Sequence, residues 1–240
     1  MLFRSVYLQM GRYSESLSNY EKALEIQQKS LTPDHPDLAI TYNTIGSVYS
    51  KMGRYSESLS NYEKALQIQQ KSLSPDHPDL ATTYNNIGSV YLQMGRYSES
   101  LSNYEKALKI RQKSLPPDHP DLATTYNTIG SVYLQMGRYS ESLSNYEKAL
   151  EIQQKSLPPD HPDLATTYGN IGVVYSKMGR YLESLSNYEK ALEIQEKYLP
   201  ADHPNLAISY DRIAVARAGL NRHSEDIALG AVMEKSSKID

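Results

Sequence analysis

The chain has 240 residues, and its 25 lysines and arginines nearly balance its 28 aspartates and glutamates, for a net charge of -3. This balance excludes a protein that binds nucleic acid mainly by neutralising phosphates. The absence of cysteine excludes disulfides and thiolate metal sites. No apolar run approaches the roughly 20 residues of a membrane span, and the N-terminal segment lacks the apolar core of a signal peptide. We therefore expect a cytoplasmic protein that binds neither nucleic acid nor membranes.

An internal repeat of 42 residues organises the sequence. The tripeptide Gly-Arg-Tyr recurs with this spacing at 11–13, 53–55, 95–97, 137–139 and 179–181. The units 53–94 and 95–136 differ at only four positions. Self-similarity at a fixed period is typical of tandem arrays, in which each unit packs on its neighbours. We expect such an array over residues 1–220.

The chain is expected to begin inside a helix. Phe3 and Met10 match Ile45 and Met52 one period later, so the first helix of the first hairpin is expected to be truncated. A half repeat leaves apolar surface uncovered. This predicts that copies of the chain associate end to end.

A first helix is expected in each unit, and in one unit it runs from about Pro78 to Met94. Apolar or small residues recur there every three or four positions, as an amphipathic helix requires, at Leu80, Tyr84, Ile87, Gly88, Tyr91 and Met94. Asp76 or His77 is placed to cap this helix, and proline suits its first turn. Gly95 is expected to end it, because glycine tolerates the left-handed conformation common just past a helix.

A second helix is expected from about Ser98 to Ser114, followed by a proline-rich connector at 115–120. Two antiparallel helices joined by a short turn cannot bury both apolar faces alone, so each hairpin must stack on the next. Gly88 and Ala107 are expected at close approaches between helices. The pattern predicts an all-α fold, a solenoid of stacked helix hairpins.

The repeat pattern decays near the C-terminus. Asp211 and Arg217 stand where the preceding unit has Gly169 and Tyr175. Residues 221–240 keep helical character as far as about Lys235 and then become polar. We expect a capping helix with a frayed tail in this segment.

The repeat resembles the tetratricopeptide repeat, a helix-turn-helix unit of 34 residues. The resemblance is carried by Tyr84, Ile87, Gly88, Tyr91, Gly95, Tyr97, Ser100, Tyr104 and Ala107. The longer unit, with Asp-His-Pro-Asp-Leu-Ala and Tyr-Glu-Lys-Ala-Leu, looks like the repeat domain of kinesin light chains. The resemblance implies a right-handed superhelix whose first helices line a concave groove. Kinesin light chains hold extended peptides there, and the aromatic and acidic residues of these peptides meet several basic side chains.

A polar arc on each first helix, opposite the apolar one, is expected to face that groove. Five of the seven positions that differ between units 95–136 and 137–178 fall on this arc. Free drift of an exposed face is the alternative explanation, but exposed Glu105 and Lys106 do not vary between these units. The expected groove residues are Asn43, Ser47, Lys51, Thr82, Asn85, Asn86, Ser89, Gln93, Asn127, Ser131, Gln135, Asn170 and Lys177.

The asparagines at 43, 85 and 127 form a ladder that is expected to hydrogen-bond the backbone of an extended peptide. Each side-chain amide offers both a donor and an acceptor. Selectivity for ligand side chains is expected from Ile40, Leu92, Leu134 and Val173. Lys51, Lys177 and Arg212 are the only cations expected in the groove, so a strict preference for acidic ligands is not expected.

Five histidines recur once per connector, at 35, 77, 119, 161 and 203. Their separation should follow the helix packing distance of about 8–10 Å, whereas zinc holds its ligands at about 2.1 Å. Capping is therefore expected, with no metal and no cofactor. An active site needs unique residues that converge in one cleft, so repetition argues against an enzyme.

Two functions remain open from the sequence. The first is a non-enzymatic scaffold that captures an extended peptide or partner segment in the groove. The second is a structural spacer that assembles end to end, with an incidental groove. The near identity of the units favours the spacer, and the clustering of differences on the polar arc favours the receptor.

Overall fold

The computed structural model describes residues 12–236, with side chains as far as residue 222. The described residues form helices and no strands, which confirms the expected all-α fold of sequentially packed hairpins. The expected truncated helix around Phe3 and Met10 lies outside these residues. The helices are α2 (Tyr13–Ser30), α3 (Pro36–Lys51), α4 (Tyr55–Ser72), α5 (Pro78–Gln93), α6 (Tyr97–Ser114), α7 (Pro120–Gln135), α8 (Tyr139–Ser156), α9 (Pro162–Lys177), α10 (Tyr181–Tyr198) and α11 (Pro204–Ser236).

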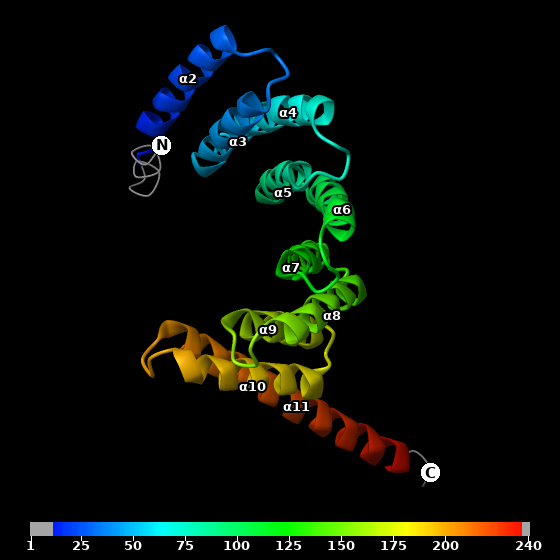
Figure 1. Ribbon diagram of the computed structural model, residues 1–240. Coiled ribbons are helices and arrows are strands. Elements are labelled where there is room, and N and C mark those ends of the chain that lie inside the picture. Colours follow the sequence, from blue (N-terminus) through cyan, green and yellow to red (C-terminus); the bar gives the residue numbers. More distant parts are fainter. Residues whose placement is uncertain (1–11, 237–240) are drawn as a thin grey trace. The chain divides into compact units, whose positions relative to one another are not determined.

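The chain separates into two compact units, residues 1–117 and 118–240. In the first unit, α3 pairs with α4 and α5 pairs with α6, while α2 packs on α3 and α4 on α5. In the second unit, the pairs are α7 with α8 and α9 with α10, and α8 packs on α9 as α10 does on α11. Figure 1 shows the order of these hairpins along the chain.

Local chemistry sets both ends of each first helix. Nδ1 of His77 accepts a hydrogen bond from the backbone N–H of Asp79 at 3.2 Å, so the histidine, and not Asp76, is the N-cap of α5. Pro78 occupies the first turn, where its missing N–H costs nothing. The hairpin then turns at Gly95, whose φ of 71° lies in the left-handed region that side chains disfavour.

Tyrosines of several second helices each join three helices. The ring of Tyr146 on α8 lies against Gly130 of its own hairpin, where an added Cβ would come within 2.9 Å of a ring carbon. The same ring packs on Ile171 and Val174 of α9. Gly88 makes the equivalent contact with the tyrosine of α6, so the expected close approach at this glycine is confirmed.

The last helix departs from the repeat because its turn signal is lost. Asn221 stands where the preceding repeats have the turn glycine, and α11 continues without a break from Pro204 to Ser236. The capping helix expected from residue 221 is thus the continuation of α11. In the other described repeats a glycine lies against the tyrosine of the following second helix. Ala214 stands at this glycine position in α11, and it is exposed.

Candidate functional site

A hollow of about 410 Å³ lies between the first helices α3 and α5 of the first unit. Four of the expected groove residues meet there, namely Asn43 and Ser47 from α3 and Thr82 and Asn86 from α5. Ile40 supplies an apolar wall and is 58% exposed. The hollow is completed by Thr44, Gln69 and Asp79.

The side-chain amide of Asn43 makes a hydrogen bond within the fold. Its Nδ2 donates to Thr83 Oγ1 at 2.9 Å, and the hydroxyl of Thr83 donates to Oε1 of the buried Gln69 at 2.7 Å. This polar link joins α3, α4 and α5 behind the hollow. It leaves the Asn43 side chain less free to serve a ligand than the ladder hypothesis requires.

The second unit repeats this link with one difference. Asn127 Nδ2 donates to Thr167 Oγ1 at 2.8 Å. The acceptors Asn127 Oδ1 and Gln153 Oε1 are buried without a hydrogen-bond partner in the described part of the chain. Buried acceptors of this kind normally find a donor in protein, water or ligand.

Asn85 and Asn86 differ from Asn43 and Asn127 in their hydrogen bonding. Both are half-buried on α5, and neither side chain makes a hydrogen bond within the part of the chain that the structure describes. Each therefore retains two donors and one acceptor oxygen for a ligand. Of the ladder residues, Asn85 fits backbone capture better than Asn43 or Asn127 does.

A second hollow of about 260 Å³ lies between α9 and α11 in the second unit. It contains the expected Asn170 and Arg212. Gly169 replaces the ladder asparagine here, and the Arg212 Nη1 lies 3.6 Å from where a Cβ on that glycine would be. The guanidinium also lies 6.0 Å from the ring centre of Tyr188. The glycine therefore makes room for a cation in this hollow.

Three of the expected groove serines lie near buried tyrosine hydroxyls of the second helices. Burial raises the pKa of Tyr146 to about 12, and a hydrogen bond from Ser131 opposes that shift. Burial likewise raises the pKa values of Tyr62 and Tyr104, opposed by hydrogen bonds that involve Ser47 and Ser89. These phenols stay protonated at neutral pH. The serines thus lie close to the buried hydroxyls.

The remaining expected residues lie toward the C-terminal ends of the first helices. Lys51, Gln93, Gln135 and Lys177 are exposed. Two residues expected to select ligand side chains behave differently, because Leu134 packs in the core around Tyr146 and Val173 packs beside Tyr188.

Several residues of the two hollows escaped the sequence analysis. Gln69 and Gln195 belong to second helices, which the helical-arc argument did not cover. Asp79 sits in the first turn of α5, before the polar arc becomes regular. The recurring pairing of a glutamine with a threonine or serine 14 residues later is the signal that would have found the glutamines.

The five connector histidines share one role in the structure. Nδ1 of His35, His77, His119, His161 and His203 accepts a backbone N–H at 3.2 Å from two residues ahead. Among the described residues there is no group of three or more histidine, aspartate or glutamate side chains placed to hold a metal. No described helix has the length and apolar character of a membrane span.

Comparison with known proteins places this geometry among the repeat solenoids. Overlapping segments of the chain match the Tetratricopeptide repeat family at residues 5–71, 37–113, 79–155, 121–197 and 163–225. The fold is similar to that of a putative kinesin light chain from Podosopora anserina with nearly identical TPR-like repeats, with a TM-score of 0.74 and 24% identity over 83% of this chain and 94% of that one. BtubC (BKLC) from P. vanneervenii gives a TM-score of 0.74 and 24% identity over 83% of this chain and 81% of that one. MamA gives a TM-score of 0.60 and 21% identity over 82% of this chain and 96% of that one. No curated protein sequence matches the chain.

Proposed function

Because the chain belongs to the tetratricopeptide repeat family, we propose that it is a non-enzymatic scaffold that binds an extended peptide segment of a partner protein. The proposed ligand lies along the groove face of the first helices. The observation that carries this proposal is the hollow between α3 and α5, where polar side chains and the exposed Ile40 line a space of about 410 Å³. A volume of this size suits one or two ligand side chains beside a bound backbone.

The chemistry of the hollow supports recognition of a peptide backbone. The hydroxyls of Thr44 and Thr82 donate to carbonyls of their own helices at 2.9 Å and 3.3 Å, so their oxygens remain as acceptors for ligand N–H groups. The Asn86 amide can donate to a ligand carbonyl and accept from a ligand N–H. In the second unit, Arg212 adds a positive charge that favours an acidic residue of a ligand bound between α9 and α11.

Selection from a displayed random-peptide library tests this function. We expect enriched peptides whose affinity falls at least about tenfold, or about 1.4 kcal/mol, in an Asn85→Ala/Asn86→Ala variant. Neither asparagine side chain makes a hydrogen bond to the described residues, so the variant should remain folded. The matched control is Asn103→Ala on the second helix α6, which should bind as the original chain does. Absence of enrichment with a folded, helical sample would contradict the groove function.

Self-association is a second candidate function, favoured by exposed apolar residues of α11. Ile208 is 49% exposed and Val215 is 59% exposed, and their spacing of seven residues puts them on one face of the helix. Ala207 is exposed there too, although the equivalent Ala165 is only 1% exposed under α10. Contiguous apolar patches of this kind mark interaction surfaces.

We expect sedimentation velocity to show concentration-dependent association through this face. A Val215→Glu variant should shift the population toward monomer, because a charge would be buried in the contact. The matched control is Thr82→Glu, which adds the same charge to α5 instead of α11. A chain that remains monomeric at every concentration would rule out the assembly function.

A further inference from the structure

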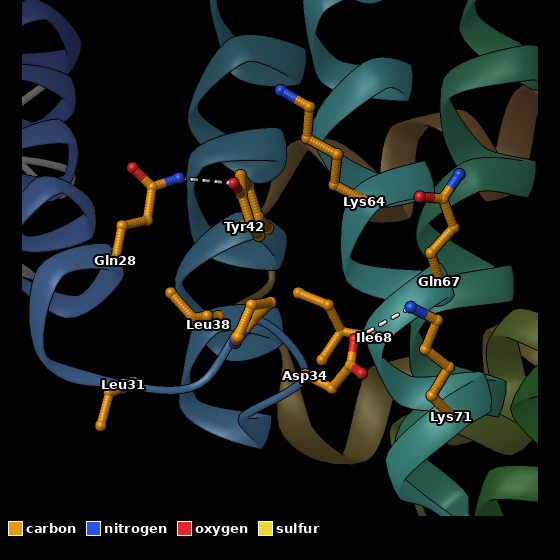
Figure 2. Close-up of a pocket in the computed structure, with 10 residues that line it drawn as sticks. Gln28, Leu31, Asp34, Leu38, Tyr42, Lys64, Gln67, Ile68 and Lys71 are labelled. Carbon is orange, nitrogen blue, oxygen red and sulfur yellow. Dashed lines mark hydrogen bonds and ion pairs between the residues drawn. The ribbon is translucent and has the colours of Figure 1, made fainter.

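A second kind of hollow recurs on the first unit, away from the groove. One hollow, of about 420 Å³, is lined by Leu31, Leu38, Tyr42 and Ile68 among others, and Figure 2 shows it between α2, α3 and α4. The next, of about 390 Å³, has Leu73, Leu80, Tyr84 and Ile110 at the equivalent positions. Neither shares a residue with the groove hollow.

Each of these hollows has an apolar floor and a polar wall. In the first, Gln28 Nε2 donates to the Tyr42 hydroxyl at 2.9 Å, and Lys71 pairs with Asp34 at 3.0 Å. In the second, the floor residues Leu80 and Ile110 are 3% and 8% exposed. Its wall repeats the first, because Lys113 pairs with Asp76 at 2.9 Å.

The two hollows differ in charge at one position. Gln67 lines the first and Lys109 lines the second. The first hollow thus has two lysines beside one aspartate, and the second has three. Lys109 is exposed and makes no ion pair within the described part of the chain. Lys106 lies 5.4 Å from the ring centre of Tyr84, so it too remains open to an anion.

The same position carries the opposite charge elsewhere in the array. Glu151 and Glu193 are the equivalents of Lys109, and Glu193 lies 3.6 Å from Lys197, the equivalent of Lys113. An acidic residue at this position therefore engages a lysine of its own helix. A lysine at this position adds an unpaired positive charge beside an apolar floor.

We propose that the hollow around Lys109 binds an acidic linear segment of a partner protein, independently of the groove. An apolar side chain of the segment packs on Leu80 and Ile110, and carboxylates beside it meet Lys106 and Lys109. The volume of about 390 Å³ accommodates a side chain rather than a whole helix. Apolar walls next to the ammonium groups strengthen their attraction for carboxylates relative to open water.

The probe is a fluorescein-labelled pentapeptide of one leucine flanked by two glutamates on each side, titrated by fluorescence anisotropy at low ionic strength. We expect the Lys109→Glu variant to bind this peptide at least about tenfold more weakly than the original chain does. The affinity of Lys109→Gln should lie between those of the original chain and Lys109→Glu. Both substitutions install residues that the chain already carries at equivalent positions, so the fold should tolerate them. The reciprocal variant, Gln67→Lys, should raise the stoichiometry from one peptide to two.

The controls separate this site from the groove and from charge alone. Lys51→Gln, on the groove side, should leave the affinity unchanged. A pentapeptide with serine in place of leucine should bind more weakly, because it cannot use the apolar floor. The proposal is overturned if Lys109→Glu binds the leucine peptide as the original chain does, if Gln67→Lys leaves the stoichiometry at one, or if the serine peptide binds equally well. Loss of binding in Lys51→Gln would move the acidic ligand to the groove and would also overturn it.

Discussion

Replacement of Tyr146 by alanine should lower the free energy of unfolding by about 3–5 kcal/mol, the range for loss of a buried aromatic side chain. The ring is 1% exposed, and it contacts Gly130 of its own hairpin together with Ile171 and Val174 of the next. Its loss would leave a cavity where three helices meet. Because repeat arrays are stabilised through nearest-neighbour interfaces, the effect should loosen both α7–α8 and α9. Urea unfolding followed by circular dichroism measures it.

The glycine opposite the ring provides an internal control. Gly130→Ala alone should destabilise by about 1–3 kcal/mol, since the new Cβ would crowd a ring that neighbouring side chains hold in place. In the Tyr146→Ala background the same change should be neutral or stabilise by up to about 1 kcal/mol, because alanine is the better helix former. Additive effects in this double-mutant cycle would show that the two residues are not in the predicted contact.

Replacement of Thr83 by valine should cost about 1–3 kcal/mol, because it leaves buried polar partners unsatisfied. The hydroxyl is fully buried. It donates to Gln69 Oε1 at 2.7 Å and accepts from Asn43 Nδ2 at 2.9 Å. Valine has nearly the same shape, so lost hydrogen bonds rather than lost volume would carry the effect.

The neighbouring threonine is the matched control for this substitution. Thr82 is exposed on the same helix, and among the described residues its hydroxyl bonds only the Pro78 carbonyl, at 3.3 Å. Thr82→Val should therefore change the free energy of unfolding by less than about 0.5 kcal/mol. Equal costs for the two variants, measured by urea unfolding, would show that the buried link between α3, α4 and α5 does not stabilise the unit.

Much of the candidate site followed from the helical period alone. Asn43, Ser47, Thr82 and Asn86 were assigned to one arc, and the structure gathers all four around one hollow. The sequence analysis did not separate the asparagines that serve the fold from those that remain open. Asn43 and Asn127 donate to threonines 40 residues ahead, and a helical-arc argument contains no information about partners on another helix.

The sequence by itself determined the hairpins and where they begin, turn and end. These features depend on neighbours along the chain: a histidine caps the backbone two residues on, and a glycine such as Gly95 accepts a positive φ. In the last repeat, Asn221 stands at the position of this turn glycine, and α11 continues through the position without a turn.

Only the tertiary structure decided which polar and charged groups remain available to a partner. Asn43 and Asn86 are chemically identical, yet one bonds Thr83 and the other bonds no side chain or backbone group in the described residues. Lys109 and Lys113 lie one turn apart, yet only Lys113 has an aspartate within reach. Availability depends on contacts between helices far apart in the chain, because a hydrogen bond or ion pair forms only when folding brings both partners within about 3 Å.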